Sequence, residues 1–587
     1  MQTELEYRTL IDLFNGSFSK IKSLDKECLE IIRAERRESL TFGQLKTRAQ
    51  DFALWLIRDR DIQVKDKVAV LGKNRADWDV ALWGIILAGA VPVLIDPERP
   101  VEGVQNHVLN TDARLIVMAD DYQDESSRRE LKEWASGQGI GLIGMTIFEK
   151  IGVSPVRDQK EKVSNGVIST EKAELFEKIR DGVQAEDTAV ILCTSGTTGD
   201  PREVELTHTN FIANLQGSVE KIKLTHEDTL GHILPPHHSF GLTVGKLLPF
   251  CVGANNVYTN QYRRVSELIR DKGVTIFIAV PALFTVLAKK VEENLATVKK
   301  GKPFVKLLDR CLPKLVGKRM IRRLGWDRLR FFLAGSAPMP KWVMDVFWRR
   351  GILLYEGYGT TENSPVYGFN ESPGKLGSVG KPISTILVKI VNEEGQSLQA
   401  GEKGEIALGG PCIMKGYYKN PNATQAVVKT DENGIRWLLT GDLGYLDEDG
   451  NLSITGRKKY LIVLPGGKNV NPELVESALS QAHYVREVLV VPDLRKDSVG
   501  IEQETVRAII RPDWDMIESN TSFSYSDLVE QPQVLKTLVW QSVNECQRKS
   551  RRLSSYEKVS SHHLEIRIEE FQKTSTGKIK REVYMKV

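Results

Sequence analysis

A loop rich in glycine and hydroxyl side chains follows a short apolar run near residue 190. Its sequence is Thr194-Ser195-Gly196-Thr197-Thr198-Gly199. The two glycines tolerate positive φ angles and leave backbone N–H groups open, while the hydroxyls add donors at close spacing. A loop with these properties can wrap phosphate oxygens, although a simple surface turn can have the same composition. The GxxxxGKS/T pattern of the common nucleotide-binding P-loop is missing.

Three further stretches extend this pattern toward the C-terminus. They are GYGTTENSP from Gly357, TGDLGYLDEDGNLSITGRKK from Thr440 and TSTGKIKRE from Thr574. Together with ILCTSGTTGDPREVELTHTNF around the loop, they resemble the acyl- and aryl-adenylating superfamily of acyl-CoA synthetases, peptide-synthetase adenylation domains and firefly-type luciferases. The resemblance extends from about Leu40 to the C-terminus and involves at least five motifs. The acyl-CoA synthetase branch, particularly its long-chain members, resembles this chain most.

The resemblance implies that the loop from Thr194 to Gly199 holds the β- and γ-phosphates of ATP. After the proline, the family mostly has Lys-Gly, whereas this chain has Arg202 and Glu203. Arg202 keeps a cation near the phosphates, while Glu203 adds a negative charge and replaces a flexible glycine. This departure is compatible with altered loop motion or an altered affinity for ATP. It also leaves open the hypothesis that the protein is a sensor that binds adenylate without catalysis.

The resemblance places the adenine base between two short segments. The ring of Tyr358 offers a face on which adenine can stack, and Gly359 follows it. Gly335, Ser336 and Ala337 form the opposite wall, where small residues allow close approach. Gly357, just before this tyrosine, is expected to add apolar lining to the pocket for the carboxylic acid.

The resemblance also implies an ATP-bound Mg²⁺ ion. Glu362 is a hard oxygen ligand of the kind that Mg²⁺ prefers, and Thr194 is the implied second protein ligand. Thr361 is placed to donate to the α-phosphate. Outside this motif, Glu362 would be interpreted as a solvated surface acid.

Asp442 resembles the acid that accepts both ribose hydroxyls, since one carboxylate offers two acceptor oxygens to a vicinal diol. Arg457 resembles its partner at the start of a small mobile domain, and Lys459 lies where the family has its hinge. Tyr460 departs from the family, which often has Asp there. Lys578 resembles the lysine that a closing domain brings to the α-phosphate, where it offsets developing charge.

The segment His237–Gly241, within the longer stretch Leu234–Thr243, resembles the lining of the carboxylic-acid pocket, and His238 stands where the family often has an aromatic residue or His. Amino-acid-activating relatives usually have an Asp here, and its absence indicates a substrate without an amino group. His237 and His238 are adjacent, and on one strand they would point to opposite faces, so we expect them not to share a metal ion. Gly466 and Gly467 resemble the loop beside which the pantetheine arm of coenzyme A, or of an acyl carrier protein, enters.

Residues 299–330 contain twelve Lys or Arg and two Asp. Phe304, Leu308, Cys311 and Leu315 have helical spacing, which predicts one apolar face. A basic amphipathic helix can lie on an anionic membrane or meet an acidic partner, whereas a core-packed helix with a solvated basic face has the same pattern.

The elements that must position these residues follow from hydrophobic patterning. Buried strands are predicted at Lys67–Leu71, Val91–Ile95 and 115–118, and a helix is predicted over Asp77–Leu87. This alternation of strands and helix predicts a parallel α/β sheet. Further strands are expected at 190–193, 276–280, 330–334, 404–408 and 451–454. The polar stretch 121–184 is expected to mix surface helix and loop.

With 587 residues, the chain is too long for one core. The sequence predicts a large α/β adenylation domain over residues 1–456 and a small mobile α+β domain over 457–587. The 81 basic and 77 acidic residues nearly balance, so we expect no nucleic-acid partner. Six scattered cysteines favour a reducing, cytoplasmic setting.

These patterns predict an enzyme that uses ATP and Mg²⁺ to convert a fatty acid, most plausibly a long-chain one, into acyl-AMP and then into a thioester. Coenzyme A is the expected acceptor. The alternatives are transfer to acyl carrier protein and a sensor that binds adenylate without catalysis.

Overall fold

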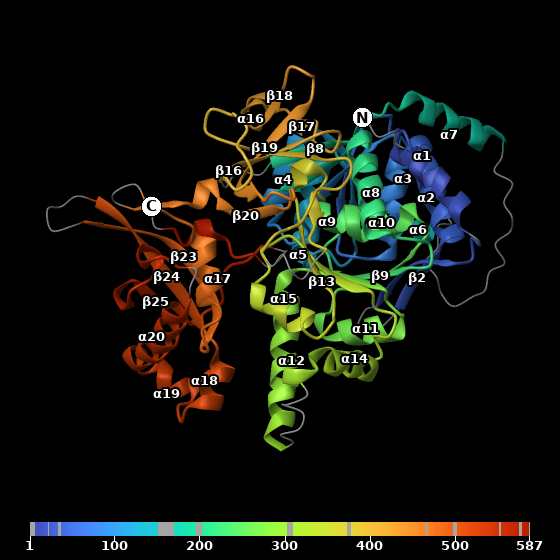
Figure 1. Ribbon diagram of the computed structural model, residues 1–587. Helices are drawn as coiled ribbons and strands as arrows, with labels where there is room; N and C mark the ends of the chain where they lie inside the picture. The colour runs from blue at the N-terminus through green and yellow to red at the C-terminus, as the bar shows by residue number, and fades with distance from the viewer. Residues whose placement is uncertain are drawn as a thin grey trace. The chain divides into compact units, whose positions relative to one another are not determined.

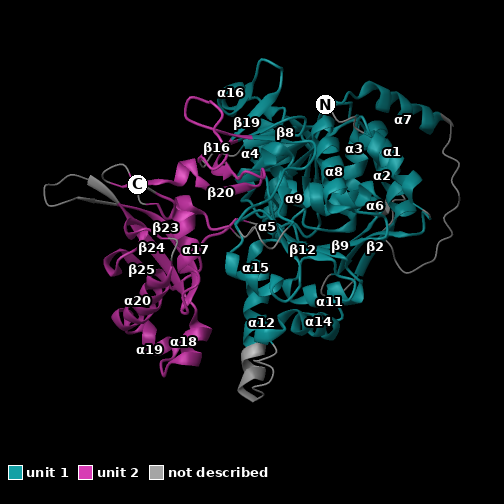
Figure 2. Ribbon diagram, in the orientation of Figure 1, with its two compact units in different colours: residues 1–388, 407–439 teal, residues 389–406, 440–587 magenta. Residues whose placement is uncertain are grey.

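The computed structural model describes residues 6–21, 23–32, 37–150, 170–194, 202–301, 309–371, 377–464, 468–496, 502–550, 553–574 and 578–585. The chain forms two compact units, which Figure 2 colours separately. One comprises Met1–Val388 and Ala407–Leu439, the other Lys389–Ile406 and Thr440–Val587. The boundary expected at residue 456 falls within the second unit, and the expected division of the chain stays a prediction.

A seven-stranded sheet in the first unit has the order β17-β8-β7-β4-β3-β5-β6. Its central strands run parallel, as the alternation of strands and helices predicted. The five parallel strands are β3 (Lys67–Leu71), β4 (Val91–Ile95), β5 (Ala113–Met118), β6 (Gly141–Gly144) and β7 (Thr188–Thr194). At one edge, β8 (Arg202–Thr207) and β17 (Gly416–Tyr417) pair antiparallel. The short strand β6 lies in the stretch for which only helix and loop were expected.

An eight-stranded sheet in the same unit has the order β14-β13-β12-β11-β9-β10-β1-β2. Its interior strands pair parallel with one another: β9 (Thr229–His232), β10 (Asn255–Thr259), β11 (Ile276–Ala279), β12 (Phe331–Ala334), β13 (Leu354–Tyr358) and β1 (Glu27–Ile32). The edge strands β2 (Arg37–Thr41) and β14 (Gly368–Phe369) are antiparallel. Phe277, Phe332 and Phe347 pack into the core beneath this sheet.

Helices accompany both sheets (Figure 1). Those of the first half are α1 (Leu10–Ser17), α2 (Phe42–Arg60), α3 (Ala76–Leu87), α4 (Val101–Asn110), α5 (Glu125–Gly137), α6 (Ile147–Lys150), α7 (Thr170–Gly182) and α8 (His208–Ile222). Then follow α9 (Ser239–Leu242), a π-helix at Thr243–Leu247, α10 (Leu248–Cys251), α11 (Val265–Asp271), α12 (Pro281–Gly301), α14 (Pro313–Leu324), α15 (Lys341–Trp348) and α16 (Pro421–Val427). Among the residues with assigned structure, no helix is long and apolar enough to span a membrane.

The chain passes between the units through a five-stranded sheet. Its strands are β15 (Leu387–Val391), β16 (Gly404–Gly409), β18 (Val428–Thr430), β19 (Arg436–Leu446) and β20 (Leu452–Arg457). A hairpin turn at Asp447–Gly450 joins β19 to β20.

The second unit continues with a β21–β22 hairpin and a three-stranded sheet in the order β23-β24-β25. The bounds are β21 (Ile462–Leu464), β22 (Lys468–Val470), α17 (Pro472–Leu479), β23 (Val485–Lys496), β24 (Glu502–Pro512), α18 (Trp514–Asn520), α19 (Tyr525–Val529), α20 (Pro532–Lys549) and β25 (Leu564–Ile566). Val490, Ile510 and Val539 are among the side chains of its separate core.

The single helical face expected from Phe304, Leu308, Cys311 and Leu315 is interrupted between the two of these positions that the structure describes. Cys311 is exposed, and Leu315 is 53% exposed. Leu312 is not helical and Pro313 starts α14, so the helical register on which the expectation rested is interrupted. Met320, Ile321 and Leu324 instead pack against the core of the first unit. Phe304 and Leu308 lie outside the described residues.

A buried ion pair joins α3 to the π-helix in the first unit. Lys246 Nζ lies 2.8 Å from Asp79 Oδ2, and the Tyr258 hydroxyl donates to the same oxygen at 2.8 Å. The two charged side chains are only 2% and 6% exposed. Burial lowers the pKa of Lys246, whereas Asp79 raises it. Removing one partner of such a pair is costly because the other charge stays buried without compensation.

We therefore expect Lys246→Met to destabilise the first unit by about 3–5 kcal/mol. The measurement is the apparent midpoint of thermal unfolding. The double variant Lys246→Met/Asp79→Asn should recover much of the loss, because neither charge then remains.

Lys419→Met serves as the control, since it breaks a pair with Asp112 in which both side chains are more than half exposed. Its effect on the midpoint should be far smaller. Equal shifts in the two single variants would contradict the importance of the buried pair.

Candidate active site

The expected phosphate loop closes a β-hairpin. Strands β7 and β8 pair antiparallel, with Thr194 opposite Arg202. The Thr194 hydroxyl donates to the Arg202 carbonyl at 3.1 Å. The hairpin thus brings the two ends of the loop together, while Ser195, Gly196, Thr197, Thr198 and Gly199 lie outside the described residues.

Arg202 and Glu203 point to opposite faces of β8, as neighbours on a strand do. The Arg202 guanidinium lies over the Tyr417 ring at 4.8 Å from its centroid. Glu203 is buried, and its Oε1 lies 2.9 Å from His107 Nδ1 and accepts a hydrogen bond from Asn110 at 3.2 Å. The unusual acid therefore binds the C-terminal turn of α4, and its charge does not share the face of β8 that carries Arg202.

Tyr417 links Arg202 to Glu362. The tyrosine hydroxyl donates to Glu362 Oε1 at 3.0 Å. Burial, and next the nearby Glu362 carboxylate, raise the pKa of Tyr417, so the phenol stays a donor. The Glu362 carbonyl also accepts the Met414 N–H at 2.8 Å. Two of the predicted residues, a cation and a candidate metal ligand, thus share one aromatic side chain that the sequence analysis missed.

The two walls expected for adenine follow neighbouring parallel strands. Residues 335–337 come directly after β12, and Tyr358 ends β13. Buried Glu356 on β13 accepts the Met339 N–H at 2.8 Å, which ties the segment after residue 337 to β13. Burial raises the pKa of Glu356 to about 7.

Close backbone approach explains two glycines of this region. A Cβ at Gly359 would lie 1.5 Å from the Pro365 carbonyl oxygen, so no larger residue fits. A Cβ at Gly335 would meet the Phe240 ring at 2.8 Å. Gly357 has room for ordinary contact, with its nearest neighbour at 3.4 Å. Phe240 therefore packs against the predicted adenine wall.

The expected acid-pocket segment also contacts the predicted metal motif. The Ser239 and Thr361 hydroxyls lie 3.1 Å apart. His238 precedes Ser239 as the N-cap residue of α9. The motifs that start at residues 194, 234 and 357 therefore meet within the first unit.

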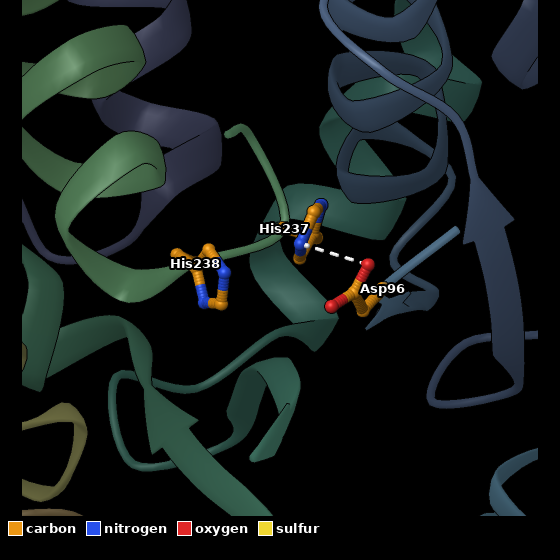
Figure 3. Close-up of side chains that lie close together, drawn as sticks. All are labelled: Asp96, His237 and His238. Atoms are coloured by element: carbon orange, nitrogen blue, oxygen red, sulfur yellow. Dashed lines mark ion pairs between the residues drawn. The ribbon is translucent and has the colours of Figure 1, made fainter. Parts of the chain in front are cut away.

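The premise that His237 and His238 lie on one strand is wrong. Both residues lie in a turn between β9 and α9, where strand alternation does not apply. Their ring centroids are 4.4 Å apart, and Asp96 lies beside them (Figure 3).

In the second unit, Asp442 and Arg457 lie opposite each other on β19 and β20. Arg457 Nε is 2.9 Å from Asp442 Oδ1, and the Asp442 side chain is 4% exposed. The Thr440 hydroxyl accepts the Asp442 N–H at 3.1 Å, which fixes the start of this strand pair. The predicted ribose acid and its basic partner are thus brought together.

Lys459 belongs to a short helical turn that contacts the C-terminal segment. Its ammonium is 3.9 Å from Glu582, and the Tyr460 hydroxyl donates to the same carboxylate at 2.7 Å. The Arg581 guanidinium lies 5.1 Å from the centroid of the Tyr460 ring. Tyr460, which departs from the family pattern, therefore anchors the segment that carries Lys578.

The Lys578 carbonyl accepts the Thr574 N–H at 2.8 Å. The residue as a whole is exposed. Desolvation around its ammonium, and then the positive charge of Arg457, lower the pKa of Lys578 to about 8, while Asp442 raises it. The predicted catalytic lysine is thus electrostatically coupled to the predicted ribose pair. Gly466 and Gly467 lie outside the described residues.

Tyr417, Glu582 and Asp96 are the contributors that sequence reasoning missed. Tyr417 is separated from Glu362 by 55 residues and from Arg202 by more than 200. No motif spacing marks such a contact, because it exists only once β17 joins the edge of the seven-stranded sheet.

Comparison with known proteins agrees with this geometry. Residues 21–418 match the family described as AMP-binding enzyme. A long-chain-fatty-acid–CoA ligase of Salmonella typhimurium is 26% identical over 506 residues, 83% of each chain. A chloroplastic long-chain-fatty-acid–[acyl-carrier-protein] ligase of Arabidopsis thaliana, AEE15, is 26% identical over 92% of this chain and 80% of its own.

Solved structures share the fold over nearly the whole chain. ATP-bound MatB from Rhodopseudomonas palustris has a TM-score of 0.70 at 22% identity, covering 98% of both chains. The anthranilate CoA ligase AuaEII, in complex with anthranoyl-AMP, has a TM-score of 0.73 at 21% identity, covering 99% of this chain and 97% of its own. With a family match over more than half of its length, this chain belongs to the AMP-binding enzyme family.

Proposed function

We propose that this protein uses ATP to activate a fatty acid as acyl-AMP and then transfers the acyl group to a thiol. The observation that carries the proposal is the meeting of three motifs in the first unit. Arg202 and Glu362 share Tyr417, and Thr361 contacts Ser239 of the acid-pocket segment. These contacts support the proposal that phosphate, metal and carboxylate bind at one place.

In the first half-reaction, the acid's carboxylate oxygen attacks the α-phosphorus of ATP, and pyrophosphate leaves. Glu362 and Thr194 would hold the Mg²⁺ that accompanies ATP, and Arg202 would offset phosphate charge. Thr361 would donate to the α-phosphate. Adenine would lie between Tyr358 and the 335–337 segment.

We propose roles for three residues of the second unit as well. Both oxygens of the Asp442 carboxylate suit the ribose diol, with Arg457 beside them. Lys578 would neutralise charge that develops on the α-phosphate. We propose that residues 457–587 then rotate about Lys459, so that Lys578 leaves the α-phosphate and the thiol can enter. The thiol sulfur then attacks the acyl carbon, and AMP is released.

A fatty acid is favoured because Leu234–Thr243 has no acidic residue that would pair with an amino group. The names of the relatives support the same class, and they differ in the acceptor thiol, which is CoA in one and acyl carrier protein in the other. We propose coenzyme A as the acceptor.

The experiment that tests the function is product analysis with ATP, Mg²⁺ and a panel of acids. Pyrophosphate should appear only with an acid, and long aliphatic acids should outperform acetate, benzoates and amino acids. A thioester should form with CoA and, if at all, more slowly with acyl carrier protein. If no acid in the panel releases pyrophosphate, the sensor alternative replaces the enzyme.

Glu362→Gln keeps the shape of the side chain but removes its charge. We expect acid-dependent pyrophosphate release to fall by about 10²-fold or more, with a higher Mg²⁺ requirement, because a metal ligand is lost. Tyr417→Phe is the matched control, since it removes only the hydroxyl that positions Glu362 and should cost much less. Equal Mg²⁺ requirements in Glu362→Gln and the parent would refute the ligand role.

Lys578 should act only in adenylation. Lys578→Ala should slow acyl-AMP formation by about 10²-fold or more, and thioester formation from supplied acyl-AMP much less. The exposed Lys580 is the control in the same segment, and Lys580→Ala should leave both steps unchanged. Equal loss of both steps in Lys578→Ala would exclude a role confined to the first half-reaction.

The pH profile provides a second readout of Lys578. A lysine is charged below its pKa, so a pKa near 8 means that the charge is lost as pH rises through about 8. The kcat/KM of adenylation, which reports the free enzyme, should therefore fall above about pH 8. Lys578→Arg stays charged and should lack this decline, even if its overall rate is lower.

A membrane contact is a separate proposal that rests on α14. Within this helix, only Gly317 is fully buried. Leu312 and Leu315 are each more than half exposed beside a cationic face. The basic side chains of that face are exposed: Lys314, Lys318, Arg319, Arg322 and Arg323. Exposed leucines next to cations favour an anionic lipid surface over a purely polar partner.

Reversing Lys318, Arg319, Arg322 and Arg323 to Glu should abolish pelleting with vesicles of phosphatidylcholine and phosphatidylserine. Each basic residue contributes roughly 1 kcal/mol near such a surface. Activity on short, water-soluble acids should remain. The control applies the same total charge change to dispersed exposed positions: Arg129, Lys132, Lys178 and Lys403.

The two charge-reversed variants separate the possible roles of α14. If only the α14 variant loses pelleting, the helix binds membrane. Loss of transfer to carrier protein with pelleting intact would instead assign the helix to a protein partner. If the α14 variant retains both vesicle pelleting and transfer to carrier protein, the basic face of α14 contacts only solvent.

A further inference from the structure

Three potential metal ligands meet where the two sheets of the first unit approach each other. Asp96 follows β4 of the seven-stranded sheet, and His237 and His238 follow β9 of the eight-stranded sheet. One ligand atom from each residue lies within 4.8 Å of the other two. Figure 3 shows His237 between the other two side chains, with its ring close to the Asp96 carboxylate.

The most informative residue of this cluster is His237, because its ring is buried without hydrogen bonds. It is 5% exposed, and neither ring nitrogen has a hydrogen-bond partner among the described residues. A neutral imidazole has one unprotonated ring nitrogen, and this nitrogen can bind a metal ion. A buried ring without hydrogen bonds requires an explanation.

The distances suit a small ion. Two ligand atoms bound to one tetrahedral ion at about 2.0–2.2 Å lie about 3.4 Å apart. His237 Nε2 and Asp96 Oδ1 are already 3.5 Å apart. His238 is half-buried, and its ligand atom lies within 4.8 Å of those of Asp96 and His237.

The charges around the cluster are balanced. Lys73 and Arg99 are the nearby cations that disfavour a charged His237, and Asp96 favours it. Lys73 is itself paired with Glu98 at 2.9 Å. The Asp96 side chain is 17% exposed, which gives an ion access from solvent.

We propose that Asp96, His237 and His238 form a transition-metal site that takes Zn²⁺ or a similar ion and is separate from the Mg²⁺–ATP site. Two imidazoles and one carboxylate are a common zinc ligand set, with a water molecule in the fourth position. Mg²⁺ and Ca²⁺ prefer oxygen ligands, so the Mg²⁺ that accompanies ATP should not compete.

Occupancy would also regulate the enzyme, a consequence that rests on the proposed function. His238 is the residue assigned to the acid pocket. A metal ion that holds its ring withdraws it from the carboxylate, so Zn²⁺ should inhibit by competing with the acid and not with ATP.

The binding test uses full-length, chelator-treated protein titrated with Co²⁺, whose visible absorption reports tetrahedral coordination. We expect one Co²⁺ per chain, displaced by Zn²⁺ and unaffected by excess Mg²⁺. His237→Gln and Asp96→Asn should each weaken binding at least tenfold. His562→Gln is the matched control, because His562 and His563 are also adjacent but lie in the second unit. Binding that survives His237→Gln and Asp96→Asn, in variants with the parent's circular dichroism, overturns the site.

The regulatory test measures pyrophosphate release at fixed Mg²⁺–ATP with buffered free Zn²⁺. Zn²⁺ should raise the KM for the acid in the parent and in His562→Gln, but much less in Asp96→Asn. If Zn²⁺ binds as expected without affecting that KM, the regulatory step is wrong and the site stands. Because the absorption titration needs no turnover, it still tests the site if the protein activates no acid.

Discussion

Tyr417 contacts two oppositely charged side chains, and the geometry of the first unit's site depends on both contacts. Arg202 lies on the face of its ring, and Glu362 accepts its hydroxyl. Arg202 and Glu362 come from different parts of the chain, and both contact the same tyrosine side chain. A displacement of either one would therefore disturb the contact that the other makes with Tyr417. The hairpin that carries Arg202 and the turn that carries Glu362 are therefore held in one register by a residue with no charge of its own.

Strand alternation explains how the chain accommodates an acid beside its phosphate loop. Arg202 and Glu203 are neighbours, yet β8 directs them to opposite faces. Glu203 enters a buried polar group with His107 and Asn110, where its charge is hydrogen-bonded. A residue that looked like a defect in the nucleotide site is thus a contact between sheet and helix, and it gives no support to a decayed, non-catalytic site.

The sequence predicted the elements whose signals are local. The strands at 67–71 and 91–95 have the expected bounds, and Asp442 and Arg457 came together because a hairpin turn between them sets the register. Contacts across distant segments were out of reach, as Tyr417 illustrates. The turn that holds His237 and His238 was mistaken for a strand, since a pair of residues carries no periodicity. Pro313 restarted a helix whose spacing had been extended through it, so Cys311 and Leu315 do not share the one helical face that was expected.

The exposed Cys311 gives the protein a selective chemical handle. All six cysteines are free, and Cys28, Cys193, Cys251 and Cys412 are buried. Burial raises the pKa of each of these four thiols, so few reactive thiolates form there. Cys546 is only partly exposed, and burial raises its pKa as well. A thiol-reactive fluorophore would therefore attach first at residue 311, two residues before the basic helix begins. The emission of a dye at that position would change if the helix moved from water to a lipid surface.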